Sequence, residues 1–323
     1  MSSKPLVFLT RPSPPNGVEL LAKECEIRMW KEETPISRED FLKQSRGANA
    51  LFIHPSVKID DELLDSVGTQ LKVVGTMSVG LDHVDIEACK KRGVKVGYTP
   101  DVLTSSVAEL TVGLLIATAR KLKPGFEAAI TGQWKWQSGL WMTGIKLEGK
   151  VLGIVGLGRI GIAVAKRLKG FGFSKIVYCG RSESSRAPEV SAEYATFDDV
   201  LKQSDFVVAT CSVHAGNKEL FDQKAFTTMK KTAIFINVTR GALVNQDDLY
   251  DALASGEIYA AGIDVTTPEP LPPDHKLHQL PNITISPHLG SATREAREAM
   301  CGLTALNILA GLKDQPLPSP VPL

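Results

Sequence analysis

The stretch that decides the fold is Lys150-Val-Leu-Gly-Ile-Val-Gly156-Leu-Gly158-Arg-Ile-Gly161, an apolar run followed by three glycines at G-x-G-x-x-G spacing. In a dinucleotide-binding unit the first glycine allows a tight turn, the second lets the backbone approach a pyrophosphate, and the third permits close helix–strand packing. Amides at the N-terminus of the following helix then bind the anion. An amphipathic helical pattern continues through Ile162–Gly170, and the next strand pattern is Lys175–Cys179. This strand–helix–strand context favours a Rossmann cofactor site over a glycine-rich surface loop.

The end of the second strand indicates which dinucleotide binds. NAD-binding units place a carboxylate there, about 20 residues after the glycines, where it binds the ribose 2′-hydroxyl. This chain has Cys179-Gly180-Arg181-Ser182 instead. An arginine fork and a serine hydroxyl bind a 2′-phosphate, which a carboxylate would repel. The sequence therefore favours NADPH over NADH, against the alternative that Arg181 is a solvated residue of a polar loop.

Outside this unit, short β-branched runs alternate with helix-length amphipathic segments along most of the chain. Such alternation predicts βαβ units and parallel sheets, that is, the α/β class. Because single hydrophobic cores stop growing near about 250–300 residues, a chain of 323 residues predicts two doubly wound domains. Strands are expected in two groups, before residue 100 and after residue 150, at Leu6–Leu9, Glu26–Trp30, Ala50–Ile53, Lys72–Gly75, Lys95–Gly97, Val151–Val155, Lys175–Cys179, Asp205–Thr210, Ala233–Asn237, Ala260–Asp264 and Asn282–Ser286.

Two helical patterns mark the domain boundaries. Asp101–Lys123 repeats apolar residues at helical spacing and ends in basic residues that suit the C-terminal dipole. We expect this helix to carry the chain between the domains. Ser291–Leu312 follows the last strand, so the chain is expected to return to its first domain. The predicted division is 1–102 plus 291–323 for a discontinuous substrate domain, and 103–290 for the cofactor domain.

Composition places the chain among ordinary globular proteins. Hydrophobic residues make up 43% and charged residues 23%, which excludes a disordered or coiled-coil chain. The net charge of +1 argues against general binding to nucleic acid or anionic membranes. Neither a membrane-spanning run nor a signal or transit peptide is recognisable. The five scattered cysteines form no C-x-x-C pair, which predicts reduced thiols, no metal site and a cytoplasmic location.

Three polar motifs each follow a predicted strand of the second domain. They are Asn237-Val-Thr-Arg240-Gly241, Gly262-Ile-Asp264-Val-Thr-Thr-Pro-Glu269-Pro and Ser286-Pro-His288-Leu-Gly290-Ser291. Ligands of an open parallel sheet bind at the carboxyl ends of its strands. Reduction of a 2-keto acid needs a proton donor, which an imidazolium beside a carboxylate supplies, and a cation, since arginine binds a carboxylate with two hydrogen bonds. His288, Glu269 and Arg240 are therefore the candidate catalytic residues, although each alone is typical of a loop or a surface.

The glycine motif, N-x-x-R-G, D-V-x-x-P-E-P and P-H-x-G-S-A-T together resemble the D-isomer-specific 2-hydroxyacid dehydrogenases over essentially the whole chain. Other stretches are similar to the glyoxylate reductase/hydroxypyruvate reductase branch, namely Thr76-Met-Ser-Val-Gly-Leu-Asp-His83, Gly97-Tyr-Thr-Pro-Asp-Val-Leu-Thr104, Asn245-Gln-Asp-Asp-Leu-Tyr250 and Asp264-Val-Thr-Thr-Pro-Glu-Pro-Leu-Pro272. The resemblance implies a flavodoxin-like substrate domain and a Rossmann cofactor domain. It also implies NADPH-dependent reduction of glyoxylate to glycolate and of hydroxypyruvate to D-glycerate.

The resemblance assigns roles to individual residues. His288 would donate the proton while nicotinamide supplies hydride, with Glu269 as the partner of His288 and Arg240 as the substrate anchor. The backbone amides of Val79 and Gly80 would hold the substrate carboxylate. Ser291, beside His288, would contact substrate. The resemblance further implies that the cofactor lies against Gly156, Gly158, Arg159, Ile160, Gly161, Ser212, Val238, Asp264 and Gly290.

The resemblance also implies a homodimer joined through the cofactor domains. In the resembled branch a tryptophan of the partner subunit reaches the active site. Trp136, within Trp134-Lys-Trp136-Gln-Ser-Gly-Leu-Trp141, is the candidate. The local register leaves Gln137 as an alternative for that place, and burial of the tryptophans in a dimer interface is equally compatible with the sequence.

Two rival functions remain open from the sequence. A dehydrogenase for another D-2-hydroxy acid would use the same chemistry, but no extra phosphate-binding cluster is recognisable around the expected substrate pocket. A dinucleotide-sensing, corepressor-like binding protein would share the fold and could keep the His, Glu and Arg residues. The chain lacks long disordered flanks for recruiting partners, which makes this second rival the weaker one.

Overall fold

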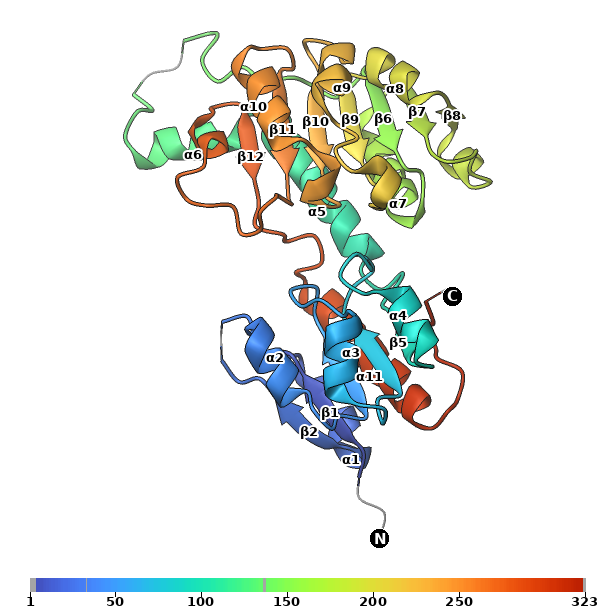
Figure 1. Cartoon of the computed structure of the whole chain (residues 1–323). Helices are drawn as coiled ribbons and strands as arrows, with labels where there is room; N and C mark the ends of the chain where they lie inside the picture. The colour runs from blue at the N-terminus through green and yellow to red at the C-terminus, as the bar shows by residue number, and fades with distance from the viewer. Residues whose placement is uncertain (1–3, 33, 136–137, 322–323) are drawn as a thin grey trace. The chain divides into compact units, whose positions relative to one another are not determined.

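The computed structural model describes residues 4–32, 34–135 and 138–321, which form two compact units (Figure 1). The first unit comprises Met1–Leu103 with Thr293–Leu323, and the second comprises Thr104–Ala292. Each unit contains one parallel sheet flanked by helices. The predicted α/β class with two doubly wound parallel sheets is therefore confirmed.

The first unit has a five-stranded parallel sheet in the order β2-β1-β3-β4-β5. This order reverses direction between β1 and β3, so the carboxyl ends of these two strands flank the topological switch point, where open α/β sheets bind ligands. The strands are β1 (Leu6–Leu9), β2 (Glu26–Met29), β3 (Ala50–Ile53), β4 (Val73–Thr76) and β5 (Lys95–Gly97). The helices are α1 (Pro15–Glu24), α2 (Arg38–Gln44), α3 (Asp61–Val67), α4 (Ile86–Lys91) and α11 (Arg294–Leu312).

The sequence explains why these elements form. The side chains of Ser37, Asp60 and Asp85 cap α2, α3 and α4 by accepting hydrogen bonds from backbone N–H groups. All residues of β3 and β4 are buried, as expected for central strands covered on both faces. α11 packs directly on β4. A Cβ atom added at Gly75 would come within 2.9 Å of Ile308 on α11, so no side chain fits between the strand and the helix there. Residues near the end of the chain thus complete the core begun by its first strands.

The second unit has a seven-stranded parallel sheet in the order β12-β11-β10-β9-β6-β7-β8. The strands are β6 (Val151–Val155), β7 (Lys175–Cys179), β8 (Ala192–Tyr194), β9 (Phe206–Ala209), β10 (Ile234–Asn237), β11 (Ala260–Ile263) and β12 (Ile283–Ile285). The helices are α5 (Thr104–Ala119), α6 (Leu122–Ile130), α7 (Arg159–Leu168), α8 (Phe197–Gln203), α9 (Gln223–Thr228) and α10 (Gln246–Ala254). Short 3-10 turns lie at Lys169–Phe171, Ala187–Val190, Ala215–Asn217, Gly241–Leu243 and Lys276–Gln279.

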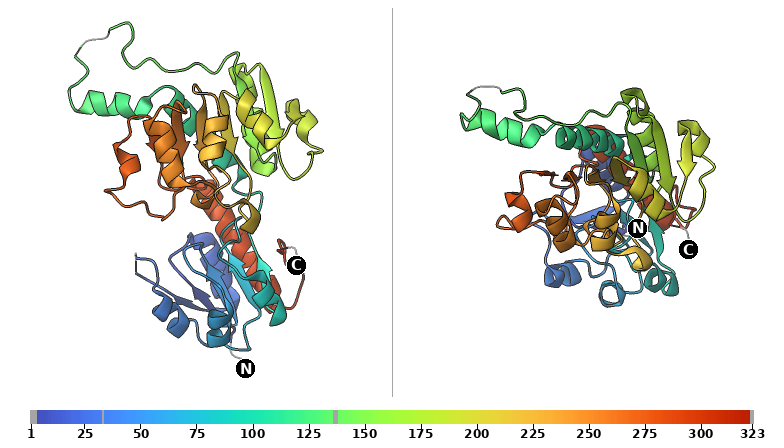
Figure 2. Two further views of the ribbon diagram at one scale, coloured as in Figure 1. Left: turned by 45° about the horizontal axis from the view of Figure 1, so that its top comes forward. Right: turned by 90° about the horizontal axis from the view of Figure 1, so that it is seen from above.

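The expected helix over Asp101–Lys123 is wrong at both ends. α5 spans Thr104–Ala119, and Lys121 adopts a left-handed conformation with φ of 54° before α6 begins. The carbonyl of Ala119 accepts a hydrogen bond from the N–H of Ile145 at 2.9 Å, so a returning loop caps α5 where the basic residues suggested continuation. Figures 1 and 2 show α6 at the periphery of the second unit, followed by a long loop that returns to β6.

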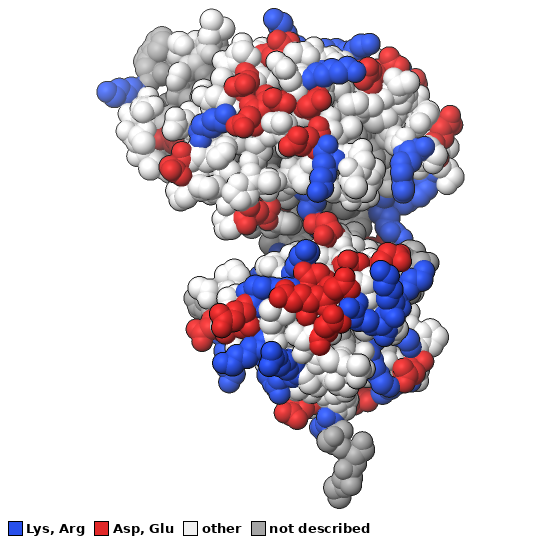
Figure 3. Space-filling model, in the orientation of Figure 1, with Lys and Arg blue, Asp and Glu red and all other residues white. Residues whose placement is uncertain are grey.

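Charges of both signs are interspersed over the surface. Figure 3 shows blue and red side chains mixed on the face it presents, in keeping with the nearly balanced composition. Ion pairs such as Arg92 with Asp61 and Asp65 hold opposite charges together on the first unit. Within the described parts of the chain, no helix is both long and apolar enough to cross a membrane.

Candidate active site

The glycine loop has the geometry that a dinucleotide cradle requires. Gly156 has φ of +100°, and a Cβ atom there would lie 2.6 Å from the backbone of Cys211. A Cβ atom at Gly161 would lie 2.5 Å from the carbonyl oxygen of Gly156, so this glycine lets α7 approach the loop closely. Gly158, the N-cap of α7, instead faces open space, with nothing within 4 Å of an added Cβ atom. The N-terminus of α7 is therefore accessible to an anion through Gly158.

Arg181 and Ser182 follow the carboxyl end of β7, and both are exposed. The neighbouring turn is held in place by its backbone, because the N–H of Ser184 donates to the Tyr178 hydroxyl at 2.9 Å. None of the described side chains forms an ion pair with the Arg181 guanidinium. Arg181 thus keeps its charge and its donors available for a ligand.

Parallel pairing brings the three polar motifs to one edge of the sheet. Asn237 at the end of β10 is in register with Ile263 of β11, which is in register with Ile285 of β12. The loops after these strands carry Arg240, Glu269 and His288, respectively. They leave the sheet at the same edge as the glycine loop after β6, as the chain order of the motifs predicted.

Arg240 is presented by a turn that Asn237 organises. The fully buried Asn237 side chain donates to the Arg240 carbonyl at 2.9 Å and accepts from the Thr239 N–H at 3.0 Å. The half-buried Arg240 guanidinium donates to the Thr239 carbonyl at 2.9 Å. Its charge also lies close enough to Glu269 to contribute to lowering the pKa of that carboxyl. Asn237 was not predicted as a site residue, although it begins the N-x-x-R-G motif.

Asp264 organises the loop that carries His288. Its carboxylate, 1% exposed, accepts from the Ser286 hydroxyl at 2.5 Å and from the N–H groups of Leu289 and Gly290 at 2.8 Å each. Its carbonyl accepts from the His288 N–H at 2.9 Å. Burial raises the pKa of Asp264 above its ordinary value, against the opposing effect of these donors. In this structure Asp264 binds the backbone of His288 and of the two residues after it, a positioning contact that sequence reasoning missed.

His288 and Glu269 form a direct pair, in which His288 Nδ1 hydrogen-bonds to Glu269 Oε1. Burial alone would raise the pKa of Glu269. The hydrogen bond to His288, the His288 and Arg240 charges and the Thr266 N–H outweigh burial and hold that pKa below its ordinary value. Both side chains remain about 40% exposed, so Nε2 of His288 is left to face a ligand. An ionised carboxylate on one ring nitrogen fixes the other as the position of proton transfer.

Other predicted site residues lie where their motifs place them. Ser212 is exposed after β9, Val238 is buried after β10, and Ser291 is half-buried beyond Gly290. In the first unit, Val79 and Gly80 follow β4, and their backbone N–H groups donate to no group among the described residues. Trp136, and the alternative Gln137, lie outside the described residues.

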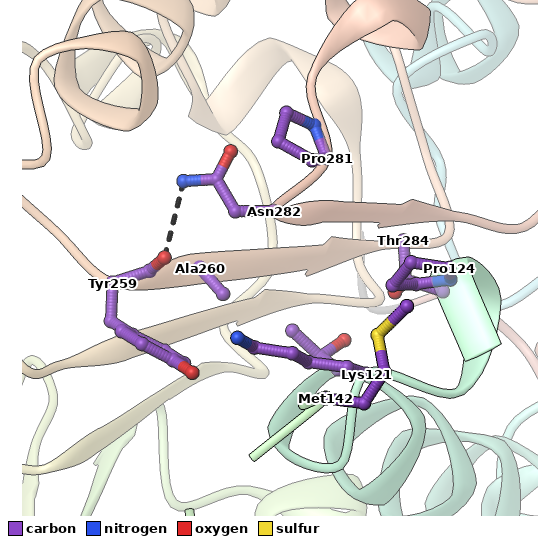
Figure 4. A pocket seen from close by; sticks show the side chains of 9 residues that line it. Lys121, Pro124, Met142, Tyr259, Ala260, Pro281, Asn282 and Thr284 are labelled. Carbon is purple, nitrogen blue, oxygen red and sulfur yellow. Dashed lines mark hydrogen bonds between the residues drawn. The ribbon is translucent and has the colours of Figure 1, made fainter. Parts of the chain in front are cut away.

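A cavity of the second unit lies at the opposite edge of its sheet (Figure 4). It has a volume of about 270 Å³, and its lining includes Tyr259 and Asn282 at the amino ends of β11 and β12. The Asn282 side chain donates to the Tyr259 carbonyl at 3.1 Å, and the Lys121 ammonium lies 5.7 Å from the Tyr259 ring centre. This cavity is separate from the edge that carries Arg240, Glu269 and His288.

Comparison with known proteins identifies the family of this chain. The family model for the NAD binding domain of D-isomer specific 2-hydroxyacid dehydrogenases matches residues 112–290. A glyoxylate reductase/hydroxypyruvate reductase of Mus musculus is 48% identical over 316 residues, covering 97% of this chain and 96% of its own. The chain belongs to the D-isomer specific 2-hydroxyacid dehydrogenase family. The family resemblance predicted from the sequence motifs is thereby confirmed.

Solved structures show how far this dehydrogenase shares its fold with others. A protein of Thermus thermophilus is 38% identical with a TM-score of 0.92, covering 98% of this chain and all of its own. An NADPH-dependent glyoxylate/hydroxypyruvate reductase of Sinorhizobium meliloti, solved with NADP and malonate, is 28% identical with a TM-score of 0.86. The match covers 99% of this chain and 97% of that one.

The dehydrogenase has no candidate metal centre among its described residues, where no three His, Cys, Asp or Glu side chains are grouped to hold an ion. All five cysteines are free thiols. Burial raises the pKa of Cys89 and of Cys179 to about 12, so both remain protonated and unreactive near neutral pH.

Proposed function

We propose that this dehydrogenase reduces glyoxylate to glycolate and hydroxypyruvate to D-glycerate with NADPH as reductant. The observation that carries the proposal is the His288–Glu269 pair beside Arg240, at the sheet edge that also holds the glycine loop. The relatives in mouse and in Sinorhizobium meliloti named above for these two substrates support it. A corepressor-like role has no comparable support.

The residues present fit a phosphorylated dinucleotide. Gly158 leaves open space at the N-terminus of α7, where a pyrophosphate would lie beside Arg159, Ile160 and Gly161. Arg181 and Ser182, both exposed at the end of β7, would bind a 2′-phosphate. Ser212, Val238, Asp264 and Gly290 would line the ribose and the nicotinamide.

The proposed chemistry assigns one task to each catalytic side chain. When bound, a reduced nicotinamide supplies hydride to the substrate carbonyl carbon. His288 donates a proton from Nε2 to the carbonyl oxygen, and Glu269 stabilises the imidazolium and its orientation. Arg240 binds the substrate carboxylate through its guanidinium fork. The free N–H groups of Val79 and Gly80 donate hydrogen bonds to the same carboxylate, and Ser291 contacts the substrate.

We further propose that the enzyme is a homodimer. Large apolar side chains of α6 and the following loop are exposed: Phe126 by 64%, Ile130 by 86% and Leu140 by 85%. Exposed apolar groups gathered on one segment are typical of association surfaces. The five free cysteine thiols support a cytoplasmic location for the enzyme.

The test is a steady-state assay of reduced-nicotinamide oxidation with glyoxylate and hydroxypyruvate, each with NADPH and with NADH. We expect turnover of both acids and a higher kcat/KM with NADPH. Preference for NADH would retain the reductase and reject the role of Arg181. No turnover of either acid with either cofactor would reject the proposed function.

A further inference from the structure

A basic cluster lies at the carboxyl edge of the first unit's sheet, outside the catalytic groups described so far. Arg11 follows β1, His54 follows β3, and Arg297 lies in the first turns of α11. β1 and β3 are the two strands that flank the topological switch point of this sheet. In flavodoxin-like sheets the crevice at this point is the position where ligands bind.

Hydrogen bonds hold the cluster in a defined arrangement. The Arg11 guanidinium donates to the Ser56 hydroxyl at 2.9 Å. The buried His54 ring contacts the Thr10 hydroxyl through Nδ1 and the Ser13 hydroxyl through Nε2, both at 3.3 Å. His54 therefore connects the loop after β1 to the loop after β3.

The cluster carries positive charge that no carboxylate of the described chain neutralises. Neither Arg11 nor Arg297 forms an ion pair among the described residues, although both approach each other closely enough to interact. Burial, followed by the charge of Arg11, lowers the pKa of Arg297. Burial, with the charges of Arg11, Arg297 and His83, lowers the pKa of His54 to about 3. Two guanidinium groups therefore lie near a neutral imidazole at this edge of the sheet.

Neighbouring guanidiniums repel each other, and an anion bound between them removes that repulsion. Each arginine presents a planar fork that matches a carboxylate or a phosphate. The Ser56 hydroxyl lies next to the Arg11 fork and can donate to the same anion. The cluster therefore has the composition of an anion site rather than that of a structural salt-bridge network.

The cluster lies close to the loop assigned to the substrate carboxylate. β3 and β4 are neighbours, and the N–H of Met77 donates to the Ile53 carbonyl at 2.9 Å at their ends. His54 is thus about 5 Å, one strand spacing, from Met77, where the loop that carries Val79 and Gly80 begins, and the loop of Arg11 is one strand further along the sheet. A small acid held by the Val79 and Gly80 amides would extend its other end within reach of an arginine side chain.

We propose that Arg11 and Arg297 bind a second acidic group at the far end of the substrate, so that the enzyme also reduces 2-oxo acids that carry two anionic groups. This inference rests on the proposed function, because it assigns a substrate class to the same reaction. We expect the second acidic group to be a carboxylate. A phosphate ester is the alternative that the test distinguishes. His54 is a positioning residue for the site and has no role in the chemistry.

The test compares kcat/KM for oxaloacetate, for the phosphate ester of hydroxypyruvate and for glyoxylate, in the wild type and in Arg11→Gln and Arg297→Gln. Each substitution is expected to lower kcat/KM for oxaloacetate roughly tenfold to hundredfold, the loss typical of a charge-assisted hydrogen bond, and for glyoxylate less than about threefold. Arg46→Gln is the matched control, because Arg46 is exposed before β3, at the opposite edge. A larger loss on the phosphate ester than on oxaloacetate would assign the site to phosphate.

A second measurement separates this inference from the proposed function. Inorganic phosphate and malonate are titrated against the intact protein without cofactor, and the rise in Tm is compared between the wild type and the Arg11→Gln/Arg297→Gln double variant. We expect a rise that the double variant loses and Arg46→Gln keeps. If the enzyme turns over glyoxylate but each arginine variant loses kcat/KM equally on all acids, the second anion site is wrong. An unchanged Tm response in the double variant would also overturn that site. Neither result would affect the proposed function. Absence of turnover on every acid, with the Tm response intact, would overturn the proposed function and leave an anion site without a substrate role.

Discussion

At the scale of single residues, the pairing of His288 with an ionised Glu269 makes a direct prediction. His288→Gln is expected to lower kcat for hydroxypyruvate by about two to four orders of magnitude, the usual contribution of a general acid. NADPH binding should change little, because the substitution leaves the glycine loop intact. Fluorescence titration of NADPH, alongside the rate assay, checks both parts. Unchanged kcat would remove His288 from the mechanism.

Glu269→Gln tests the partner. In the wild type Glu269 stays ionised because its pKa is held below the ordinary value, so its negative charge persists across the neutral range. Removing that charge takes away stabilisation of the imidazolium. The alkaline limb of the pH–kcat profile is therefore expected to move to lower pH in the variant. A parallel loss of rate at every pH would instead indicate that Glu269 only orients the ring.

The proposed preference for NADPH depends on a single side chain, Arg181. Arg181→Asp is expected to raise the Kd for NADPH about tenfold to hundredfold, because it removes a charge-assisted contact and adds repulsion. The Kd for NADH should stay within about threefold. Lys231→Asp, at an exposed lysine before β10, makes the same charge change at the opposite edge and serves as the control. Equal effects on the two cofactors would contradict the phosphate contact.

His54 links residue chemistry to stability. Its pKa is about 3 in the folded chain against 6.5 for an ordinary histidine, first because of burial and then because of nearby cations. The unfolded chain therefore binds more protons between these values, and the free energy of unfolding falls as pH falls below 6.5. We expect a loss of roughly 1.5 kcal/mol between pH 6.5 and pH 5 from this group. Urea unfolding of His54→Asn should lack that loss, whereas exposed His278→Asn should retain it.

At the scale of elements, the strand–turn–helix unit separates folding from binding. An alanine at Gly161 would bring its Cβ atom to 2.5 Å from the Gly156 carbonyl, so Gly161→Ala is expected to lower the free energy of unfolding by about 1–3 kcal/mol. Gly158→Ala meets nothing within 4 Å and should leave stability nearly unchanged. It should nevertheless weaken NADPH binding, since the methyl group occupies the space of the pyrophosphate. Thermal unfolding and cofactor titration of both variants check the pair; equal stability losses would contradict it.

Elements were predictable where local pattern and tertiary packing agree. The glycine motif, its strand and its helix follow from the residues, because each glycine has a steric reason that the motif encodes. β8 was missed because Ala192–Tyr194 is a short edge strand with no buried alternation. The break between α5 and α6 was missed because it depends on a hydrogen bond from Ile145, which is distant in sequence. Local helical spacing carries no information about such a contact.

The arrangement of the candidate site could be predicted about as well as the helices and strands. His288, Glu269 and Arg240 follow three neighbouring strands, so parallel topology alone brings them to one edge. The contacts of Asn237 and Asp264 with the backbone could not be read from spacing, because they depend on the exact course of two loops. The basic cluster escaped notice because Arg11 and Arg297 lie at opposite ends of the chain. Only the return of α11 to the first unit brings them together.

At the scale of the whole molecule, the exposed apolar segment predicts association. Phe126→Glu with Ile130→Glu is expected to convert a dimer into a monomer, because two charges would be buried at the proposed interface. Sedimentation velocity over a range of protein concentrations checks this result. Lys123→Glu, a charge change near the start of the same helix, is the control and should leave the dimer intact. A wild type that sediments as a monomer at all concentrations would contradict the proposal.

The discontinuity of the first unit has a consequence for biosynthesis. Its sheet is made from residues before Leu103, yet α11, which covers β4, is synthesised only after the whole second unit. The second unit is continuous and can be completed while the nascent chain still lacks α11. During translation the face of Val73 and Gly75 in the first unit therefore stays uncovered until α11 has been synthesised. A premature stop after the second unit would leave that face permanently open to aggregation or to chaperones.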